Sequence, residues 1–402
     1  MSLSPIEAAA AEHAAAVPML AMVERWAAVN SGTGNLAGLA TMAGLLADAF
    51  AVLPGPLALV EPAPADRVSA DGSVEPVEHG RHLHLSVRPD APVQLLLTGH
   101  MDTVFAADHP FQSARWNADG SLNSPGAADM KGGIAVMLAA LRALEAGPLA
   151  ERIGYAVVLN SDEETGSLSS AALIAQQAAG KAAALTYEPA LPDGTLAGAR
   201  GGTGNFSLTV RGRSAHAGRN PQDGRNAIVA AADLAMQLWD AARGTDLPVN
   251  PARIDGGGPN NVVPDLAILR VNFRPRNARM IRAAERAIRE AVASVTVRHD
   301  VTVHVHGGFN RPPKPLDRGS QRLFALVRRA GADLGQPIAW RATGGVCDGN
   351  NIAACGVPVI DTMGVRGGAI HSADEFLIVE SLAERAALSA VTLLRLAEGG
   401  AP

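Results

Sequence analysis

Polar side chains follow several apolar stretches of this sequence, at points where the strands of a sheet would end. In "LLLTGHMDTV", His100 and Asp102 come directly after an apolar run. Side chains at positions i and i+2 of an extended segment point the same way, so both would leave the edge of the sheet together. A histidine beside a carboxylate suits a metal ligand steadied by a neighbouring acid. A histidine that caps a turn, followed by an aspartate that stabilises the next turn, would give the same pattern.

The same arrangement recurs elsewhere in the chain, which favours a shared site. Asp129 stands in the glycine-rich "NSPGAADMKGG", three acids follow an apolar run in "LNSDEETGS", Glu188 ends the strand pattern "LTYEP", and His371 lies in the loop pattern "GGAIHSADE". Open α/β sheets bind ligands at the carboxyl ends of their strands. Two imidazoles and several carboxylates suit zinc, cobalt or manganese better than a metal that prefers thiolates.

The charges of such a site indicate hydrolytic chemistry. Two divalent ions held by two neutral imidazoles and three carboxylates would keep about one net positive charge, which a bound hydroxide neutralises. A carboxylate shared between ions roughly 3.5 to 4 Å apart would screen their repulsion, and Asp129 is the candidate. Glu163 and Glu164 would point in opposite directions in an extended segment, so one would bind metal and the other would act as general base. Asp162 is predicted to be a solvated turn residue.

Composition excludes several other classes of protein. At 402 residues, with 48% apolar and 18% charged residues, the chain predicts a globular protein of two domains. A net charge of -5 and an aromatic content of 3% argue against nucleic acid as a partner. The alanine-rich start contains Glu7 and Glu12 and lacks a basic leading region, so we expect a helix, no membrane partner and a cytoplasmic location, although a leader trimmed beforehand would leave no trace.

The order of sequence patterns predicts an α/β fold with a mainly parallel sheet flanked by helices, interrupted by an α+β insert. The catalytic domain would comprise residues 1–198 and 313–402, and the insert residues 199–312. "GARGGTG" and "NRPPKP" bound the insert, and their glycines and prolines suit a hinge on each side. Strands are expected in "LHLSVRP", "VQLLLTGH", "IGYAVVLNSDEE", "AALTYEP" and "VPVIDTMG", with three more and two helices inside the insert.

Two other catalytic motifs fit poorly. "PGAADMKGG" lacks the glycine spacing and the Gly-Lys-Ser/Thr ending of a phosphate-binding loop. "GRSAHAG" lacks the Gly-x-Ser-x-Gly spacing of a serine hydrolase. A metal-dependent reaction therefore remains the better interpretation.

Seven motifs taken together resemble one family. "GHMDTV", "GAADMKGG", "SDEETGS", "YEP", "GRSAHAG", "NVVP" and "IHSADE", in this order, are similar to those of the dinuclear zinc hydrolases that include aminoacylase, acetylornithine deacetylase and glutamate carboxypeptidase. The bacterial glutamate carboxypeptidase branch is the most similar, and the resemblance extends from about Val29 to the last helix. It implies a catalytic domain split by a lid domain through which two subunits dimerise.

The resemblance also implies a role for each candidate residue. Glu163 would be the general base, Asp102 would orient a histidine, and the peptide bond after Asp129 would be cis. Two Zn²⁺ ions are expected, with Co²⁺ or Mn²⁺ as alternatives. The ligands would be His100 and Glu188 for one ion, Glu164 and His371 for the other, and Asp129 as the bridge.

Residues of the lid and of a later loop would contact the substrate. The resemblance implies that His216 reaches across the dimer to the substrate carbonyl, and that Asn261 and Arg274 hold a substrate carboxylate. Gly345 lies in the expected substrate loop "TGGVCDGN", where Cys347 replaces the serine or threonine common in relatives. Without the resemblance, a turn histidine and a surface salt bridge would explain His216 and Arg274.

The sequence thus predicts a zinc-dependent hydrolase that cleaves an amide bond next to a free carboxylate, with a small peptide as substrate. An N-acyl amino acid deacylase is the alternative within the same chemistry. A non-catalytic protein that closes its lid on a ligand is the alternative from another class. That protein would be expected to lack part of the metal and base set, yet every position is filled.

Overall fold

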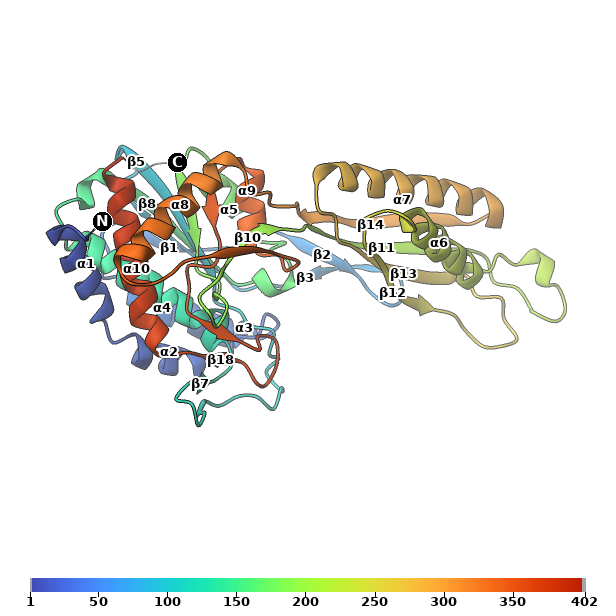
Figure 1. Cartoon of the computed structure of the whole chain (residues 1–402). Helices are drawn as coiled ribbons and strands as arrows, with labels where there is room; N and C mark the ends of the chain where they lie inside the picture. The colour runs from blue at the N-terminus through green and yellow to red at the C-terminus, as the bar shows by residue number, and fades with distance from the viewer. Residues whose placement is uncertain (1, 400–402) are drawn as a thin grey trace.

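The computed structural model describes residues 2–399 and has two sheet-based parts. Figure 1 shows a larger part, in which helices surround a central sheet, and a smaller elongated part that projects to one side. The smaller part contains β11–β14, α6 and α7, and we call it the lid. The helices are α1 (Pro5–Ala15), α2 (Met19–Ala27), α3 (Leu36–Phe50), α4 (Gly132–Glu145), α5 (Ala171–Ala178), α6 (Ala227–Ala242), α7 (Ala278–His299), α8 (Arg318–Asp333), α9 (Asp348–Ala354) and α10 (Glu380–Ala397).

Four short helical turns occur between the described helices and strands: η1 (Ala127–Lys131), η2 (Ala150–Arg152), η3 (Glu163–Thr165) and η4 (Pro221–Asp223).

The strands fall into two main sheets and three small ones. The strands are β1 (Leu57–Val60), β2 (Ala65–Val68), β3 (Val74–Val77), β4 (His82–Val87), β5 (Val93–His100), β6 (Arg115–Trp116), β7 (Leu122–Asn123), β8 (Ile153–Asn160), β9 (Ala183–Thr186), β10 (Leu196–Arg200), β11 (Thr203–Arg211), β12 (Val249–Gly256), β13 (Leu266–Phe273), β14 (Thr302–Arg311), β15 (Trp340–Thr343), β16 (Val359–Ile360), β17 (Gly367–Gly368) and β18 (Phe376–Leu377).

The central sheet has six strands in the order β1-β4-β8-β5-β9-β16. Strands β8, β5, β9 and β16 run parallel, whereas β4 is antiparallel to β8 and β1 is antiparallel to β4. Helices cover both faces, so β5 is apolar on both sides: Leu95 and Leu97 pack in the cluster that includes α1, α4 and α10, and Leu96 packs against α5 and α9. This arrangement confirms the predicted α/β fold class.

The lid is a four-stranded antiparallel sheet in the order β12-β13-β11-β14, with α6 and α7 packed on one face. The sequence patterns predicted β11, β13, β14 and both helices, but they missed β12. This strand lies at the edge of the sheet and contains Pro251, next to which its register shifts. Proline cannot donate a ladder hydrogen bond and is tolerated at edges and bulges, so β12 lacks a regular strand pattern.

The chain crosses between the two parts twice, and the crossings are fixed side by side. Backbone hydrogen bonds pair Arg200 with Lys314 in both directions, at 2.9 and 3.0 Å. Nδ2 of Asn350 donates to the carbonyl oxygens of Gly201 at 2.8 Å and Pro312 at 2.7 Å. One buried side chain of the larger part therefore holds both strands of the hinge.

The N-terminal helix packs against α4 and α10. Ser4 and Glu7 form a capping box at its start, and Arg395 Nε donates to Glu7 Oε1 at 2.6 Å. The stretch Pro5–Ala27 is apolar and long enough to cross a membrane by length and composition alone, a test that buried core helices and signal sequences also pass. The cytoplasmic location therefore stays a prediction.

Candidate metal centre

The structure brings all five predicted metal ligands together at the carboxyl ends of the central strands. His100 is the last residue of β5, Glu188 follows β9, and Glu164 lies in the turn η3 that follows β8. Asp129 lies in η1 before α4, and its peptide bond to Met130 is cis, as the resemblance implies. His371 comes from the loop between β17 and β18. Parallel strands place His100, Glu164 and Glu188 at one edge because their carboxyl ends coincide there, and the two loops bring Asp129 and His371 to the same edge.

Asp129 stands between the two imidazoles. Its Oδ1 lies 3.1 Å from Nε2 of His100, and its Oδ2 lies 3.3 Å from Nε2 of His371. Glu164 Oε2 lies 3.1 Å from Nε2 of His371, whereas Glu188 Oε1 lies 3.8 Å from Nε2 of His100. Each oxygen of Asp129 thus faces a different histidine, and His371 also lies beside Glu164, as the ligand pairs implied by the resemblance require.

The site concentrates negative charge in a buried place. Burial raises the pKa of Glu164 to about 8 and also raises the pKa of Glu188. Burial would raise the pKa of Asp129 too, but hydrogen bonds from His100 and His371 hold it below its ordinary value. Hydrogen bonds to Asp129 and Glu164 raise the pKa of His371 to about 10. The cluster therefore favours bound positive charge.

The donor set fits divalent metal ions. One ligand atom from each of His100, Asp129 and Glu164 lies within 4.8 Å of the others, and the same holds for His100, Glu163 and Glu188. Among the described residues, Glu188 Oε1 is buried and accepts no hydrogen bond. A buried carboxylate oxygen without a donor is costly unless a cation satisfies it. Nitrogen and oxygen donors of this kind suit zinc and similar ions.

The acidic turn after β8 differs from its sequence prediction. Residues Glu163–Thr165 form a 3-10 turn and not an extended segment, yet the two glutamates still diverge, with Glu164 beside His371 and Glu163 beside Arg311. The prediction that Asp162 is solvated was wrong. Its side chain is fully buried, and its Oδ2 accepts hydrogen bonds from the backbone N and the Oγ of Ser169 at 2.6 and 2.8 Å. Asp162 therefore closes the loop from residue 162 to 169 and does not face water.

Asp102 links a ligand to the acidic turn. Its Oδ1 and Oδ2 accept hydrogen bonds from the backbone N–H groups of Glu163 and Glu164, each at 3.2 Å, and Thr33 Oγ1 donates to Oδ2 at 2.7 Å. Nδ1 of His100 lies 3.0 Å from the backbone oxygen of Asp102 and 3.4 Å from its Oδ1. Asp102 thus touches the ring nitrogen of His100 that faces away from Asp129.

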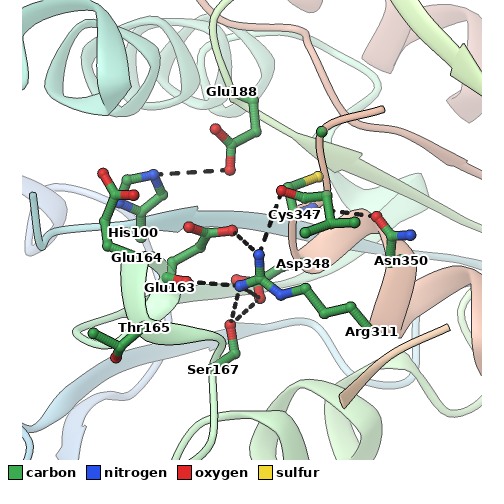
Figure 2. Close-up of polar contacts among 12 residues, drawn as sticks. His100, Glu163, Glu164, Thr165, Ser167, Glu188, Arg311, Cys347, Asp348 and Asn350 are labelled. Atoms are coloured by element: carbon green, nitrogen blue, oxygen red, sulfur yellow. Dashed lines mark hydrogen bonds and ion pairs between the residues drawn. The ribbon is translucent and has the colours of Figure 1, made fainter. Parts of the chain in front are cut away.

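The sequence analysis did not single out two residues that lie near the site. Arg311 contacts Glu163 (Figure 2), and burial raises the pKa of that glutamate to about 7 although Arg311 opposes the shift. Glu375 accepts hydrogen bonds from the backbone N–H groups of Gly126, Ala128 and Asp129 at 2.9 to 3.1 Å. It shapes the loop that carries the central aspartate. An acid close to His371 in "IHSADE" was the available hint.

A cavity of about 580 Å³ opens beside the cluster. Of the predicted substrate residues, Arg274 and Gly345 line it, together with the buried Cys347. His216 and Asn261 do not line it; the backbone N of Ala217 donates to the oxygen of Asn261 at 2.9 Å, so the two are neighbours. The loop from β11 to α6, which carries His216, projects at the outer end of the lid (Figure 1).

Comparisons with known proteins agree with this geometry. The profile of peptidase family M20/M25/M40 matches residues 96–395. Carboxypeptidase G2 of Pseudomonas sp. is 31% identical over 319 residues, 76% of this chain and 74% of the relative. Succinyl-diaminopimelate desuccinylase of Verminephrobacter eiseniae is 29% identical over 310 residues, 72% of this chain and 75% of the relative.

Solved structures share the fold. A tripeptidase from Staphylococcus aureus has a TM-score of 0.72 at 21% identity, covering 94% of this chain and 98% of its own. An M20 family metallo-carboxypeptidase from Sulfolobus solfataricus has a TM-score of 0.67 at 15% identity, covering 94% and 98%. The chain therefore belongs to peptidase family M20/M25/M40 and is a metal-dependent hydrolase of peptide or amide bonds.

Proposed function

We propose that this hydrolase cleaves an amide bond next to a free carboxylate, as a zinc-dependent carboxypeptidase of the glutamate carboxypeptidase type. The observation that carries the proposal is Arg274, which lines the same cavity as the acidic cluster. Its Nε donates to Asn272 Oδ1 at 2.8 Å, and neither Nη group hydrogen-bonds another residue within 2–399. A guanidinium presented in this way can take a carboxylate through two parallel hydrogen bonds. The 31% identity to carboxypeptidase G2 supports the same substrate type.

The residues of the chain divide the reaction among them. Divalent ions held by the five ligands would polarise the amide carbonyl and acidify the attacking water. Glu163 would accept the proton of that water and pass it to the leaving nitrogen as the C–N bond breaks, which yields a carboxylate and an amine. Burial of Glu163 favours its protonated form, which suits a group that must hold the proton of the water until the leaving nitrogen receives it.

His216 would stabilise the charge that develops on the carbonyl oxygen. Its Nδ1 accepts hydrogen bonds from the backbone N–H groups of Gly218 at 3.2 Å and Arg219 at 3.1 Å. These contacts place the ring proton on Nε2, where it can be donated to an oxyanion. Asn261 would assist Arg274 with the substrate carboxylate, and the backbone of Gly345 would border the substrate.

The arrangement of His216 supports a homodimer formed through the lid. Neither His216 nor Asn261 lines the cavity of its own chain, so a second subunit would supply them. Helix α6 exposes Val229, Met236 and Trp239, which are 51%, 56% and 48% accessible. Their spacing places them on one side of the helix, as expected for a surface that a partner covers.

A deacylase of N-acyl amino acids is the second candidate. It would use the same ligands and the same base, with a small acyl group in place of a peptide residue. Similarity to succinyl-diaminopimelate desuccinylase at 29% identity favours it specifically. Zinc is proposed as the native metal in both cases, with cobalt and manganese as alternatives because they accept the same ligand types.

A substrate panel on the metal-loaded enzyme tests the proposal. It pairs dipeptides and N-acyl amino acids that have a free α-carboxylate with the corresponding amides and methyl esters. Hydrolysis of the free acids at a kcat/KM well above that of the blocked compounds is expected. Equal turnover of both sets contradicts the carboxylate anchor, and a preference for acetyl or succinyl amino acids over dipeptides selects the deacylase.

A further inference from the structure

Arg311 belongs to the lid but inserts its side chain into the larger part. It is the last residue of β14, and its side chain is only 4% exposed. Nη1 lies 2.6 Å from Oε1 of Glu163, while Nη2 donates to the backbone oxygen of Glu163 at 2.8 Å and to Oγ of Ser167 at 2.7 Å. Figure 2 shows the guanidinium between these groups, with Asp348 behind it at 3.6 Å. One lid residue thus contacts both the side chain and the backbone of Glu163.

We propose that Arg311 is a positioning residue for the general base, and that it couples the position of the lid to the orientation of Glu163. The inference rests on the proposed role of Glu163 as base. Arg311 would not touch the reacting atoms; it would act by holding the carboxylate in place. Its planar guanidinium suits this task because two nitrogens address one residue at two points, which the single nitrogen of lysine cannot do.

The neighbours of Arg311 make the contact stiff. Ser167 Oγ donates to Asp348 Oδ1 at 2.5 Å, and Asp348 Oδ2 accepts a hydrogen bond from Asn160 Nδ2 at 2.5 Å. Asn160 is the last residue of β8, the strand that leads into the acidic turn. The guanidinium is therefore held by groups anchored to the central sheet, and it keeps the Glu163 carboxylate within reach of the metal ligands.

The position of Arg311 in the chain connects it to the hinge. Arg311 pairs with Thr203 in the lid sheet, and the next residue, Pro312, is held by Asn350 of the larger part. Arg311 is thus the first lid residue beyond the fixed crossing. A rotation of the lid about that crossing would move the backbone of Arg311 away from the groups that hold its guanidinium, and so would weaken its contacts with Glu163. A base misplaced by about 1 Å can cost roughly a hundredfold in rate.

The test compares Arg311→Met, Arg311→Lys and a matched control, Arg88→Met. Arg88 also binds a carboxylate and a backbone oxygen, those of Glu145 and Ile153, but at the opposite end of the sheet. We expect Arg311→Met to lower kcat by about a hundredfold with KM changed less than about threefold, and Arg311→Lys to recover part of the loss. Arg88→Met should lower the melting temperature and keep kcat within about threefold. Metal content should stay at the wild-type value in all three.

A double-mutant cycle with Glu163→Gln separates positioning from general structural damage. If Arg311 acts through Glu163, adding Arg311→Met to Glu163→Gln should lower kcat by less than about threefold further. On metal-free protein, the two substitutions should be non-additive in the free energy of unfolding. Additive losses in kcat, or a rise in KM with unchanged kcat, would overturn the inference in favour of a structural or substrate-binding arginine.

The two proposals fail in different ways. If Glu163→Gln retains wild-type turnover, the role of Glu163 is wrong and the inference falls with it. If Glu163→Gln is inactive but Arg311→Met has normal kcat, the proposed function stands and the positioning role alone is refuted.

Discussion

The backbone amide of Glu163 donates a hydrogen bond to Oδ1 of Asp102 at 3.2 Å, so the end of β5 holds the turn that follows β8. The backbone oxygen of Asp102 also lies 3.0 Å from Nδ1 of His100. One aspartate therefore contacts a predicted metal ligand and the predicted base together. One buried residue thus ties the predicted ligand to the turn that carries the predicted base.

Replacement of Glu163 should separate metal binding from turnover. Glu163→Gln keeps the size of the side chain but cannot accept the proton, so we expect kcat to fall by about 10²- to 10⁴-fold. The metal-to-protein ratio, measured by elemental analysis, should match that of the wild type. Near-normal turnover in this variant would refute its role as base.

Replacement of Arg274 should affect substrates according to their charge. Arg274→Ala removes the guanidinium that would bind the free α-carboxylate, so kcat/KM for free acids should fall by roughly 30- to 1,000-fold. The same substrates as amides or methyl esters should lose less than about fivefold, since they never form the ion pair. Similar losses for both sets would remove the carboxylate anchor.

Mixed dimers test whether His216 acts across the subunit interface. His216→Ala and Glu163→Gln should each inactivate a homodimer. In a mixed dimer, the subunit that keeps Glu163 would receive His216 from its partner, so random mixing should restore about a quarter of wild-type activity. The molar mass of the protein, measured by light scattering after size-exclusion chromatography, should be that of a dimer. Mixtures as inactive as their parents would indicate that His216 acts within its own chain or not at all.

The hinge should lose stability in acid. Asp361 is buried, and its Oδ2 lies 2.7 Å from Nε of Arg200 and 3.1 Å from Nζ of Lys314. Burial alone would raise the pKa of Asp361, but the two cations hold that pKa below its ordinary value. A carboxyl with a lowered folded-state pKa contributes stability above its unfolded value of about 4, and that contribution is lost as the pH falls through the folded value.

Asp361→Asn should remove that contribution and leave two buried cations uncompensated, at a cost of about 3 to 5 kcal/mol. The difference in unfolding free energy between wild type and variant should therefore be largest at pH 7 and should shrink below about pH 4. Thermal unfolding across this range measures it. A constant difference at every pH would contradict the ion pairing.

Removal of metal should act on stability as well as on rate. A chelator should abolish hydrolysis and lower the melting temperature, because an ion that binds only the folded chain stabilises it by mass action. Addition of zinc, cobalt or manganese should restore hydrolysis, with a different kcat for each metal. In His100→Ala, added zinc should raise the melting temperature much less than in the wild type. An equal rise would place the ion elsewhere.

Local sequence patterns predicted much of the fold. The apolar runs of β5 and β8 and the periodicity of α4 and α10 are properties of consecutive residues, so they could be recognised without knowledge of the partners. The edge strand β12 was missed because Pro251 interrupts its pattern, and the burial of Asp162 was missed because its partner Ser169 becomes a neighbour only when the loop closes.

By itself, the sequence determined the kinds of ligand and their placement at strand ends, because side-chain chemistry and strand periodicity are carried by short segments. The resemblance implied the central place of Asp129, but only the tertiary structure decided its distances to His100 and His371, and the contact that Arg311 makes with Glu163 across 148 residues of chain. Contacts of this kind depend on how strands pair and how the lid returns to the larger part. Distance in space is a property of the folded chain, and no local pattern encodes it.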